Sequence, residues 1–307
     1  MSAPANQRID ANWRSIYPFA SHWFEVSGGR LHYLDEGPAG ASESKGTLLF
    51  VHGNPTWSFH WRRLIGALRS EYRCVVIDHL GCGLSDKPAR FFQLSDHIAN
   101  LSALTESLNL RQLTLVAQDW GGAIGLGAAL RAPERFERIV LFNTGAFPPP
   151  YIPLRIRACR WPIVGQLAVQ GLNAFSRAAL RMTLARTQRL EPAVEAGYLA
   201  PYDSWSNRRA VYGFVKDIPS NASHATWQTL AEIEHGLPTF AHRPNRLIWG
   251  MRDWCFRPDC LERFLRVWPN ADVHRLANVG HWVVEDAPDE ALSLVKQFLN
   301  TESPSLA

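Results

Sequence analysis

The stretch that most constrains this chain covers residues 113–122 and reads LTLVAQDWGG. Its first part is an apolar and β-branched run, which is typical of a strand buried on both faces. The run stops at Asp119, two glycines follow Trp120, and the small residues 123–130 suit a helix. A buried strand, a sharp turn and a helix would present the side chain at the bend at one edge of a parallel sheet.

The residue at this bend is unusual. The common strand–turn–helix elbow that carries a nucleophile has the sequence G-x-S-x-G, but here Asp119 takes the serine position and the polar Gln118 precedes it. A carboxylate is ionised at neutral pH and needs no general base to become a nucleophile. It suits displacement of a leaving group from carbon better than peptide hydrolysis. We therefore predict that Asp119 is a nucleophile, and the alternative is a simple helix cap.

Strands and helices alternate on both sides of the elbow, which indicates a parallel sheet with helices on both faces. A hairpin is expected over residues 22–37, and buried strands over 47–51, 72–78, 113–119, 138–143, 246–250 and 272–276. The alternation breaks over 148–240, where we find no credible strand and expect helices over 161–175, 176–186 and 203–215. This pattern predicts a helical cap at 148–240, inserted between core parts 1–147 and 241–307.

Composition excludes several classes of protein. The 307 residues fit one domain with an insertion, and a net charge of +4 gives no reason to expect nucleic-acid binding. No apolar run is long enough to span a membrane, and the polar residues 1–10 do not resemble a signal peptide. The five cysteines are scattered, which predicts reduced packing residues in a cytoplasmic protein, and they lack metal-site spacing. We therefore expect no metal.

Polar residues also follow other strands. His281 lies between the last strand and the final helix, where a general base falls in the chain order nucleophile, acid, base. To activate water against an ester on Asp119 this imidazole must be neutral, which fits a pKa near its reference value. Asp253 follows the preceding strand and is the expected orienting acid, although a turn aspartate is the simpler alternative. The other position for such an acid holds the uncharged Asn143.

Two donors lie next to the predicted nucleophile. Asn54 follows the strand over 47–51, and Trp120 directly follows Asp119. Their backbone N–H groups would form an oxyanion hole. The indole of Trp120 has one donor and no acceptor, so together with the Asn54 amide it suits a large leaving anion such as halide. A turn-forming asparagine and a core tryptophan are the alternatives.

At these residues the chain resembles the haloalkane dehalogenase family of the α/β-hydrolases. The motifs are HGNPTW (52–57), DHLGCGLSDKP (78–88), QDWGG (118–122) and GHWVVED (280–286). The resemblance implies an α/β-hydrolase fold with a mostly parallel eight-stranded sheet, and no cofactor. It also implies that Asp119 attacks carbon, that Asn54 and Trp120 bind the halide, and that His281 activates water.

The arrangement of Asp119, Asp253 and His281 resembles the third subfamily of dehalogenases, which is similar to the β-lactone decarboxylases of olefin synthesis. The motifs NTGAF (143–147), QGLNAF (170–175) and APYDSW (200–205) carry the second likeness. Hydrolysis of haloalkanes, with release of halide, is our first expectation, and decarboxylation of a long-chain β-lactone to a cis-alkene is the alternative. An epoxide hydrolase would need cap tyrosines, for which the candidates are Tyr151, Tyr198, Tyr202 and Tyr212.

The expected cap is strongly basic at its start. Between Tyr151 and Leu190 there are seven arginines and no acidic residue. A solvated surface is one interpretation. The other is an amphipathic surface that contacts a membrane or a partner enzyme and admits an apolar substrate. Neutralising Arg155, Arg157 and Arg160 tests this hypothesis. The sequence leaves the oligomeric state and the chain length of the substrate open.

Overall fold

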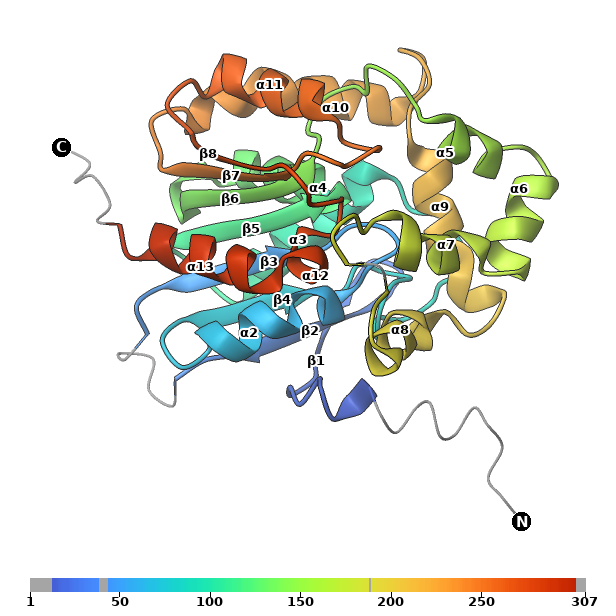
Figure 1. Ribbon diagram of the computed structural model, residues 1–307, viewed down its shortest axis with the longest axis horizontal. Coiled ribbons are helices and arrows are strands. Elements are labelled where there is room, and N and C mark those ends of the chain that lie inside the picture. Colours follow the sequence, from blue (N-terminus) through green and yellow to red (C-terminus); the bar gives the residue numbers. More distant parts are fainter. Residues whose placement is uncertain (1–12, 39–43, 188, 302–307) are drawn as a thin grey trace.

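The computed structural model describes residues 13–38, 44–187 and 189–301 (Figure 1). The polar amino-terminal residues 1–10, where we expect no signal peptide, lie outside this range. Trp13 and Tyr17 begin the described chain and are both buried. The Trp13 ring packs edge-on against Trp57, with centroids 5.5 Å apart. The described chain therefore enters the fold through an aromatic cluster.

One eight-stranded sheet forms the centre of the molecule, in the order β1-β2-β4-β3-β5-β6-β7-β8. The first hairpin is antiparallel and β2 pairs antiparallel with β4, whereas all other neighbours are parallel. This confirms the mostly parallel sheet. The strands are β1 (His22–Val26), β2 (Gly29–Glu36), β3 (Thr47–Val51), β4 (Arg73–Ile77), β5 (Leu113–Asp119), β6 (Phe136–Thr144), β7 (Asn245–Gly250) and β8 (Asp272–Leu276).

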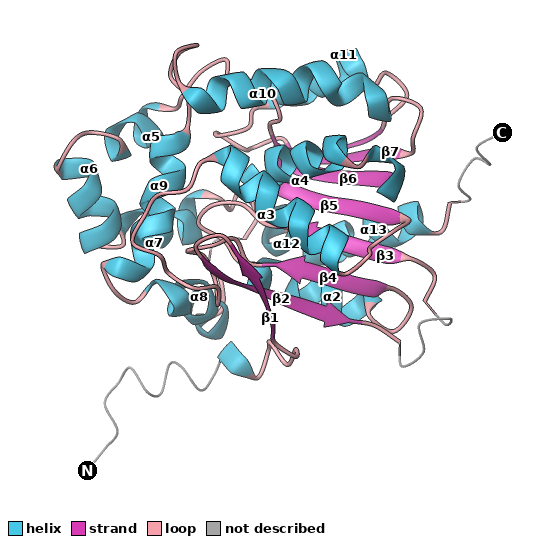
Figure 2. Ribbon diagram, turned by 180° about the vertical axis from the view of Figure 1, so that it is seen from behind, coloured by secondary structure: helices cyan, strands magenta, loops and turns pink. Residues whose placement is uncertain are grey.

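Helices cover both faces of this sheet (Figures 1 and 2). Each face has its own hydrophobic core, because the side chains of a buried parallel strand point alternately to the two faces. One face carries α2 (Arg62–Leu68), α12 (Val283–Asp286) and α13 (Pro288–Leu299). The other carries α3 (Leu94–Ser107), α4 (Trp120–Arg131), α10 (Ala225–Gly236) and α11 (Pro258–Val267).

The long connection between β6 and β7 is helical and contains no strand among its described residues. Its helices gather at one end of the sheet, beyond the carboxyl ends of the strands (Figure 1). They are α5 (Leu154–Cys159), α6 (Val164–Gln166), the π-helix η4 (Leu167–Gly171), α7 (Ala174–Met182), α8 (Pro192–Leu199) and α9 (Arg209–Asp217). Short 3₁₀ segments complete the chain: η2 (Ser58–Trp61), η3 (Pro133–Arg135), η5 (Ala200–Tyr202), η6 (Ser206–Arg208) and η7 (Leu237–Phe240).

The helix α10 lies inside the range 148–240 but packs against α3 and α4, which cover the sheet. Its buried Leu230 and Ile233 belong to the same core as those helices. We therefore propose that the cap consists of α5 to α9 and that the core resumes at α10. The amphipathic pattern of α10 looks the same whether its apolar face meets the sheet layer or another cap helix, so the sequence alone does not locate this boundary.

Candidate active site

The nucleophile elbow lies at the junction of β5 and α4. Asp119 has φ +54° and ψ −131°, a backbone conformation that L-residues rarely adopt. The neighbouring backbones approach so closely that a Cβ on Gly121 would lie 2.1 Å from the carbonyl oxygen of Val51. On Gly53 it would lie 2.2 Å from Oδ1 of Asp119. The glycines are therefore required by space, and the strained bend directs the carboxylate out of the sheet.

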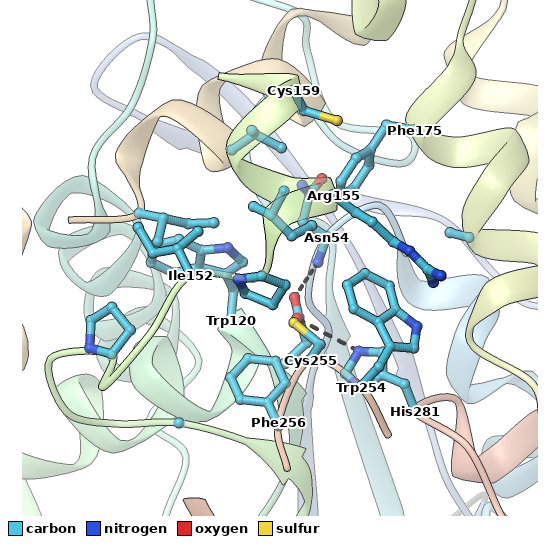
Figure 3. Close-up of a pocket in the computed structure, with 18 of the residues that line it drawn as sticks. Asn54, Trp120, Ile152, Arg155, Cys159, Phe175, Trp254, Cys255, Phe256 and His281 are labelled. Carbon is cyan, nitrogen blue, oxygen red and sulfur yellow. Dashed lines mark hydrogen bonds and ion pairs between the residues drawn. The ribbon is translucent and has the colours of Figure 1, made fainter. Parts of the chain in front are cut away.

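Two of the predicted residues, Asn54 and His281, contact this carboxylate (Figure 3). The backbone N–H of Asn54 donates to Oδ1 of Asp119 over 2.7 Å, and Nε2 of His281 lies 3.6 Å from Oδ2. On its other side, Nδ1 of His281 lies 2.7 Å from Oδ2 of Asp253. Asp253 is held in turn, because its Oδ1 accepts from the N–H of Cys255 over 2.6 Å. The structure thus brings Asp119, His281 and Asp253 into one chain of contacts.

In the free enzyme the pKa of His281 lies above the reference value that we expected, whereas the neutral base is needed only once Asp119 is esterified. Burial by itself lowers the pKa of His281, but the charge of Asp253 and the contact with Asp119 outweigh burial and raise it to about 10. The resting imidazole is therefore protonated between two carboxylates. Esterification of Asp119 would remove one of those charges. The pKa of His281 would then fall, and the histidine would become a base only after the nucleophile has reacted.

This coupling predicts the effect of Asp119→Asn, which keeps the shape of the side chain but removes its charge, as an ester does. We expect the pKa of His281 to fall by about 1 to 3 pH units, the usual effect of one close opposite charge. An NMR titration of the His281 ring measures it. As a control, Asp289→Asn at the exposed start of α13 should leave the titration unchanged. An unaltered His281 pKa in Asp119→Asn would contradict the coupling.

The predicted anion-binding residues lie beside the carboxylate. Nδ2 of Asn54 donates to the carbonyl oxygen of Val211 on α9 over 3.2 Å, which leaves its second N–H for a bound anion. The Trp120 ring packs against Phe214, also on α9, with centroids 5.5 Å apart. Its indole N–H has no hydrogen-bond partner among the residues that the structure describes. Both side chains thus retain a free donor, and α9 holds both in place.

A cavity of about 650 Å³ opens in front of Asp119. Its walls are mainly apolar and come from the cap as well as from the core, and Figure 3 shows side chains of both parts. Apolar walls with a few converging polar groups are typical of a small-molecule site. The lining includes Phe147, Ile152, Ile156, Val169, Phe175 and Leu230 together with Asn54, Asp119, Trp120 and His281.

Sequence reasoning missed a buried polar network behind the elbow. Gln118, directly before Asp119 in the elbow, donates to the carbonyl oxygen of His281 and accepts from Nε2 of His60. Nδ1 of His60 lies 2.7 Å from the hydroxyl of Tyr198, which donates to Glu285 over 2.6 Å. Glu285 also forms a two-pronged ion pair with Arg62. The only sign of this network in the sequence was Gln118 itself, a polar residue at the end of an apolar strand.

This network predicts a large loss of stability in Glu285→Ala. Both side chains of the Arg62–Glu285 pair are 4% exposed. Removal of the carboxylate would leave a buried guanidinium without a partner, which costs about 3–5 kcal/mol of unfolding free energy. Chemical denaturation measures it. The matched control is Glu262→Ala, since Glu262 pairs with Arg275 on the surface and such pairs contribute about 0–1 kcal/mol. Equal losses in the two variants would contradict the assignment.

Asn143 occupies the other position in which these folds carry the acid. Its side-chain amide accepts from the N–H of Gly250 over 2.7 Å and donates to the carbonyl of the same residue over 3.0 Å. It therefore ties the end of β6 to the end of β7. The contact that an acid would make with the histidine is made by Asp253 instead.

Comparison with known proteins identifies the family of this chain. The family described as "alpha/beta hydrolase fold" matches residues 46–288. A cis-3-alkyl-4-alkyloxetan-2-one decarboxylase of Shewanella oneidensis is 40% identical, over 95% of this chain and 92% of its own. Haloalkane dehalogenase 2 of Mycobacterium tuberculosis is 36% identical, over 92% and 96%. The chain belongs to the haloalkane dehalogenase-like α/β-hydrolases. It is an enzyme.

The fold agrees with the family. The crystal structure of the haloalkane dehalogenase DatA from Agrobacterium tumefaciens superposes with a TM-score of 0.81 at 24% identity, over 91% of this chain and 96% of DatA. This similarity concerns the fold. The family assignment rests on the sequence relatives, whose names describe two different reactions.

Proposed function

We propose that this α/β-hydrolase hydrolyses carbon–halogen bonds through a covalent ester on Asp119. The observation that carries the proposal is the carboxylate at the elbow, which faces an apolar cavity with two anion donors beside it. Asp119 attacks the carbon, and the carbon–halogen bond breaks as the ester bond forms. The halide leaves toward the second N–H of Asn54 and the indole of Trp120. These donors act on charge that develops in the transition state.

The second half-reaction uses the other two residues. With Asp119 esterified, His281 loses its proton and takes one from a water molecule, which attacks the ester carbonyl. Asp253 then faces the imidazolium and holds its ring in place. Oδ1 of Asp119 becomes the oxyanion, and the N–H of Asn54 already donates to it. Collapse of this intermediate releases the alcohol and regenerates the carboxylate.

A second reaction, decarboxylation of a cis-3,4-dialkyl β-lactone, is favoured by two observations. The relative that is 40% identical carries that activity in its name. The cavity of about 650 Å³ is also far larger than a four-carbon haloalkane requires. The donors that suit a halide suit a carboxylate equally well. We propose that a long-chain β-lactone is the physiological substrate and that the dehalogenase chemistry uses the same site.

The same nucleophile accounts for the lactone reaction without water. Asp119 attacks C4, the C4–O bond breaks, and the ring oxygen leaves as a carboxylate bound by Asn54 and Trp120. That carboxylate then departs as CO₂, its electrons form the C3–C4 double bond, and Asp119 leaves C4 as a free carboxylate. Inversion at C4 followed by anti elimination gives the cis-alkene from the cis-lactone. Atoms and charges balance with no co-reactant.

Isotope labelling distinguishes the two reactions. In H₂¹⁸O, a single turnover of 1-bromobutane should place ¹⁸O in Asp119, because water attacks the ester carbonyl. A single turnover of a long-chain cis-β-lactone should leave Asp119 unlabelled. Peptide mass spectrometry after each turnover gives the answer, and kcat/KM for the two substrates shows which one is preferred. Detection of ¹⁸O in Asp119 after the lactone reaction would contradict attack at C4.

Epoxide hydrolysis receives little support from the cap tyrosines. Among the four candidates only Tyr151 lines the cavity, and its hydroxyl donates to the carbonyl of Cys255 over 2.6 Å. Tyr198 is engaged by Glu285, and the Tyr202 hydroxyl donates to the carbonyl of Thr56 over 3.1 Å. Within the described residues, these contacts leave no tyrosine pair aimed at an epoxide oxygen near Asp119.

The cellular setting is part of the proposal. Among the described residues, no helix is long and apolar enough to cross a bilayer. All five cysteines are free thiols, which suits a reducing compartment, and we propose that the enzyme acts in the cytoplasm.

Its substrates are small apolar molecules, and halide is the product of the dehalogenase reaction. We also propose that the basic cap provides a peripheral contact surface.

A further inference from the structure

We propose that the outer face of the cap docks on an anionic lipid bilayer, and that the cavity draws its substrate from that bilayer. The face, called here the cap face, consists of Leu154, Trp161, Ile163, Val164, Leu167 and Leu172, with Arg157 and Arg160 among them. These residues belong to α5, α6, η4 and the turns between them. Both overall views place α6 at the outer edge of the molecule (Figures 1 and 2).

The apolar content of this face is exceptional for the molecule. Of the ten large apolar side chains that are exposed among the described residues, six lie within residues 154–172. Leu154, Ile163 and Leu172 are each more than 70% exposed, and Trp161 is 62% exposed. Scattered exposed apolar residues are ordinary, but a contiguous group of this size marks a binding surface. The amphipathic indole of tryptophan suits the boundary between water and lipid.

The positive charge of the cap face favours a negatively charged partner. Arg181 and Arg189 are paired with Glu195, and Arg186 with Glu290. By contrast, Arg157 and Arg160 have no ion-pair partner among the described residues. Unpaired arginines around an apolar group fit a surface of negatively charged headgroups above an acyl layer.

A second copy of the chain fits this face less well. A symmetric dimer through the face would bring the same unpaired arginines of both copies together, and like charges repel. A folded partner would need a matching concave surface for side chains that project from short helices and turns. A bilayer needs no such match, because fluid lipid adapts to the shape of the inserted residues.

The cap face also forms the roof of the cavity. Ile156, Ala168 and Val169 come from the same segment, but their side chains line the cavity in front of Asp119. One thin layer of helices therefore has apolar groups on both sides. A dialkyl β-lactone would partition into a bilayer. Docking would therefore place the roof of the cavity against the bilayer that contains the substrate. This last step rests on the proposed function, whereas docking itself does not.

Vesicle sedimentation tests the proposal on the full chain. Wild-type enzyme should sediment with vesicles of phosphatidylcholine and phosphatidylglycerol, and added salt or pure phosphatidylcholine should weaken it. Arg157→Gln and Arg160→Gln should each lower the partition coefficient about fivefold. Trp161→Ala should lower it at least about tenfold. The matched control is Trp23→Ala, since Trp23 is 50% exposed on β1 and should bind like wild type.

A kinetic measurement and gel filtration distinguish docking on a bilayer from a damaged fold and from contact between copies. Trp161 does not line the cavity, so Trp161→Ala should keep kcat/KM for soluble 1-bromobutane. Absence of wild-type binding to the anionic vesicles would overturn the proposal, as would equal losses in Trp161→Ala and Trp23→Ala. Gel filtration showing a dimer that Trp161→Ala dissociates, without vesicle binding, would identify the face as a contact between copies and also overturn it. Sedimentation and gel filtration need no turnover, so docking can fail separately from the proposed chemistry.

Discussion

Asp119→Ala should lower kcat by at least about 10⁴-fold for both the haloalkane and the β-lactone, the scale seen when a covalent nucleophile is lost. The reason is that Asp119 is the only carboxylate among the described residues that line the cavity. Asp253 is 4% exposed, bound to His281 and absent from the cavity lining. Without Asp119 neither the ester nor the released carboxylate can form. Initial rates of bromide release and of alkene formation measure the loss.

Two variants separate this effect from damage to the fold. Asp119→Asn keeps the size of the side chain and should be equally inactive, with a melting temperature close to that of the wild type. Asp289→Asn changes the same kind of group on the exposed start of α13 and should keep full activity. Turnover of either substrate by Asp119→Ala at more than about a hundredth of the wild-type rate would remove Asp119 from the role of nucleophile.

His281→Ala should stop haloalkane turnover after the first chemical step. Attack by Asp119 needs no base, whereas hydrolysis of its ester does, and loss of a general base costs about 10²–10⁴-fold. With 1-bromobutane, we expect one equivalent of bromide and an enzyme heavier by the mass of a butyl group on Asp119. Rapid-quench kinetics and peptide mass spectrometry measure the two products.

The lactone provides an internal comparison for the same variant. Decarboxylation through C4 regenerates Asp119 without water, so His281→Ala should retain far more activity toward the lactone than toward the haloalkane. His242→Ala removes an exposed imidazole and should behave like wild type with both. If no adduct accumulates in His281→Ala with the haloalkane while bromide is released steadily, His281 is not the base for ester hydrolysis.

Local sequence predicted the elements around the elbow closely. The strand over 113–119 matches β5, because a fully apolar run followed by glycines has few other solutions. The helix expected over 123–130 lies within α4, which begins earlier, at Trp120. The hairpin turn at Gly28 and the strands on either side of the cap are also confirmed. The sequence did not distinguish α10 from the cap helices, since its periodicity records one buried face but not what covers it.

The residues of the site were predictable because each follows a strand, and parallel strands end at one edge of the sheet. The pKa of His281 was not predictable, because it depends on two carboxylates 134 residues apart whose distances to the ring only folding fixes. The network behind Gln118 was hidden for the same reason. His60, Tyr198 and Glu285 stand far apart in the chain, and none belongs to a motif that predicts contact with the others.

The sequence by itself determined the fold family and the residue at the elbow, and these carry the proposed first step of the reaction. Only the tertiary structure decided that two carboxylates flank His281 and raise its pKa, that a cavity of about 650 Å³ lies in front of Asp119, and that the segment forming its roof exposes apolar side chains. Strand pattern and residue type are local properties, carried by neighbouring residues. Electrostatic coupling, cavity volume and surface exposure arise between segments that meet only when the cap folds over the sheet.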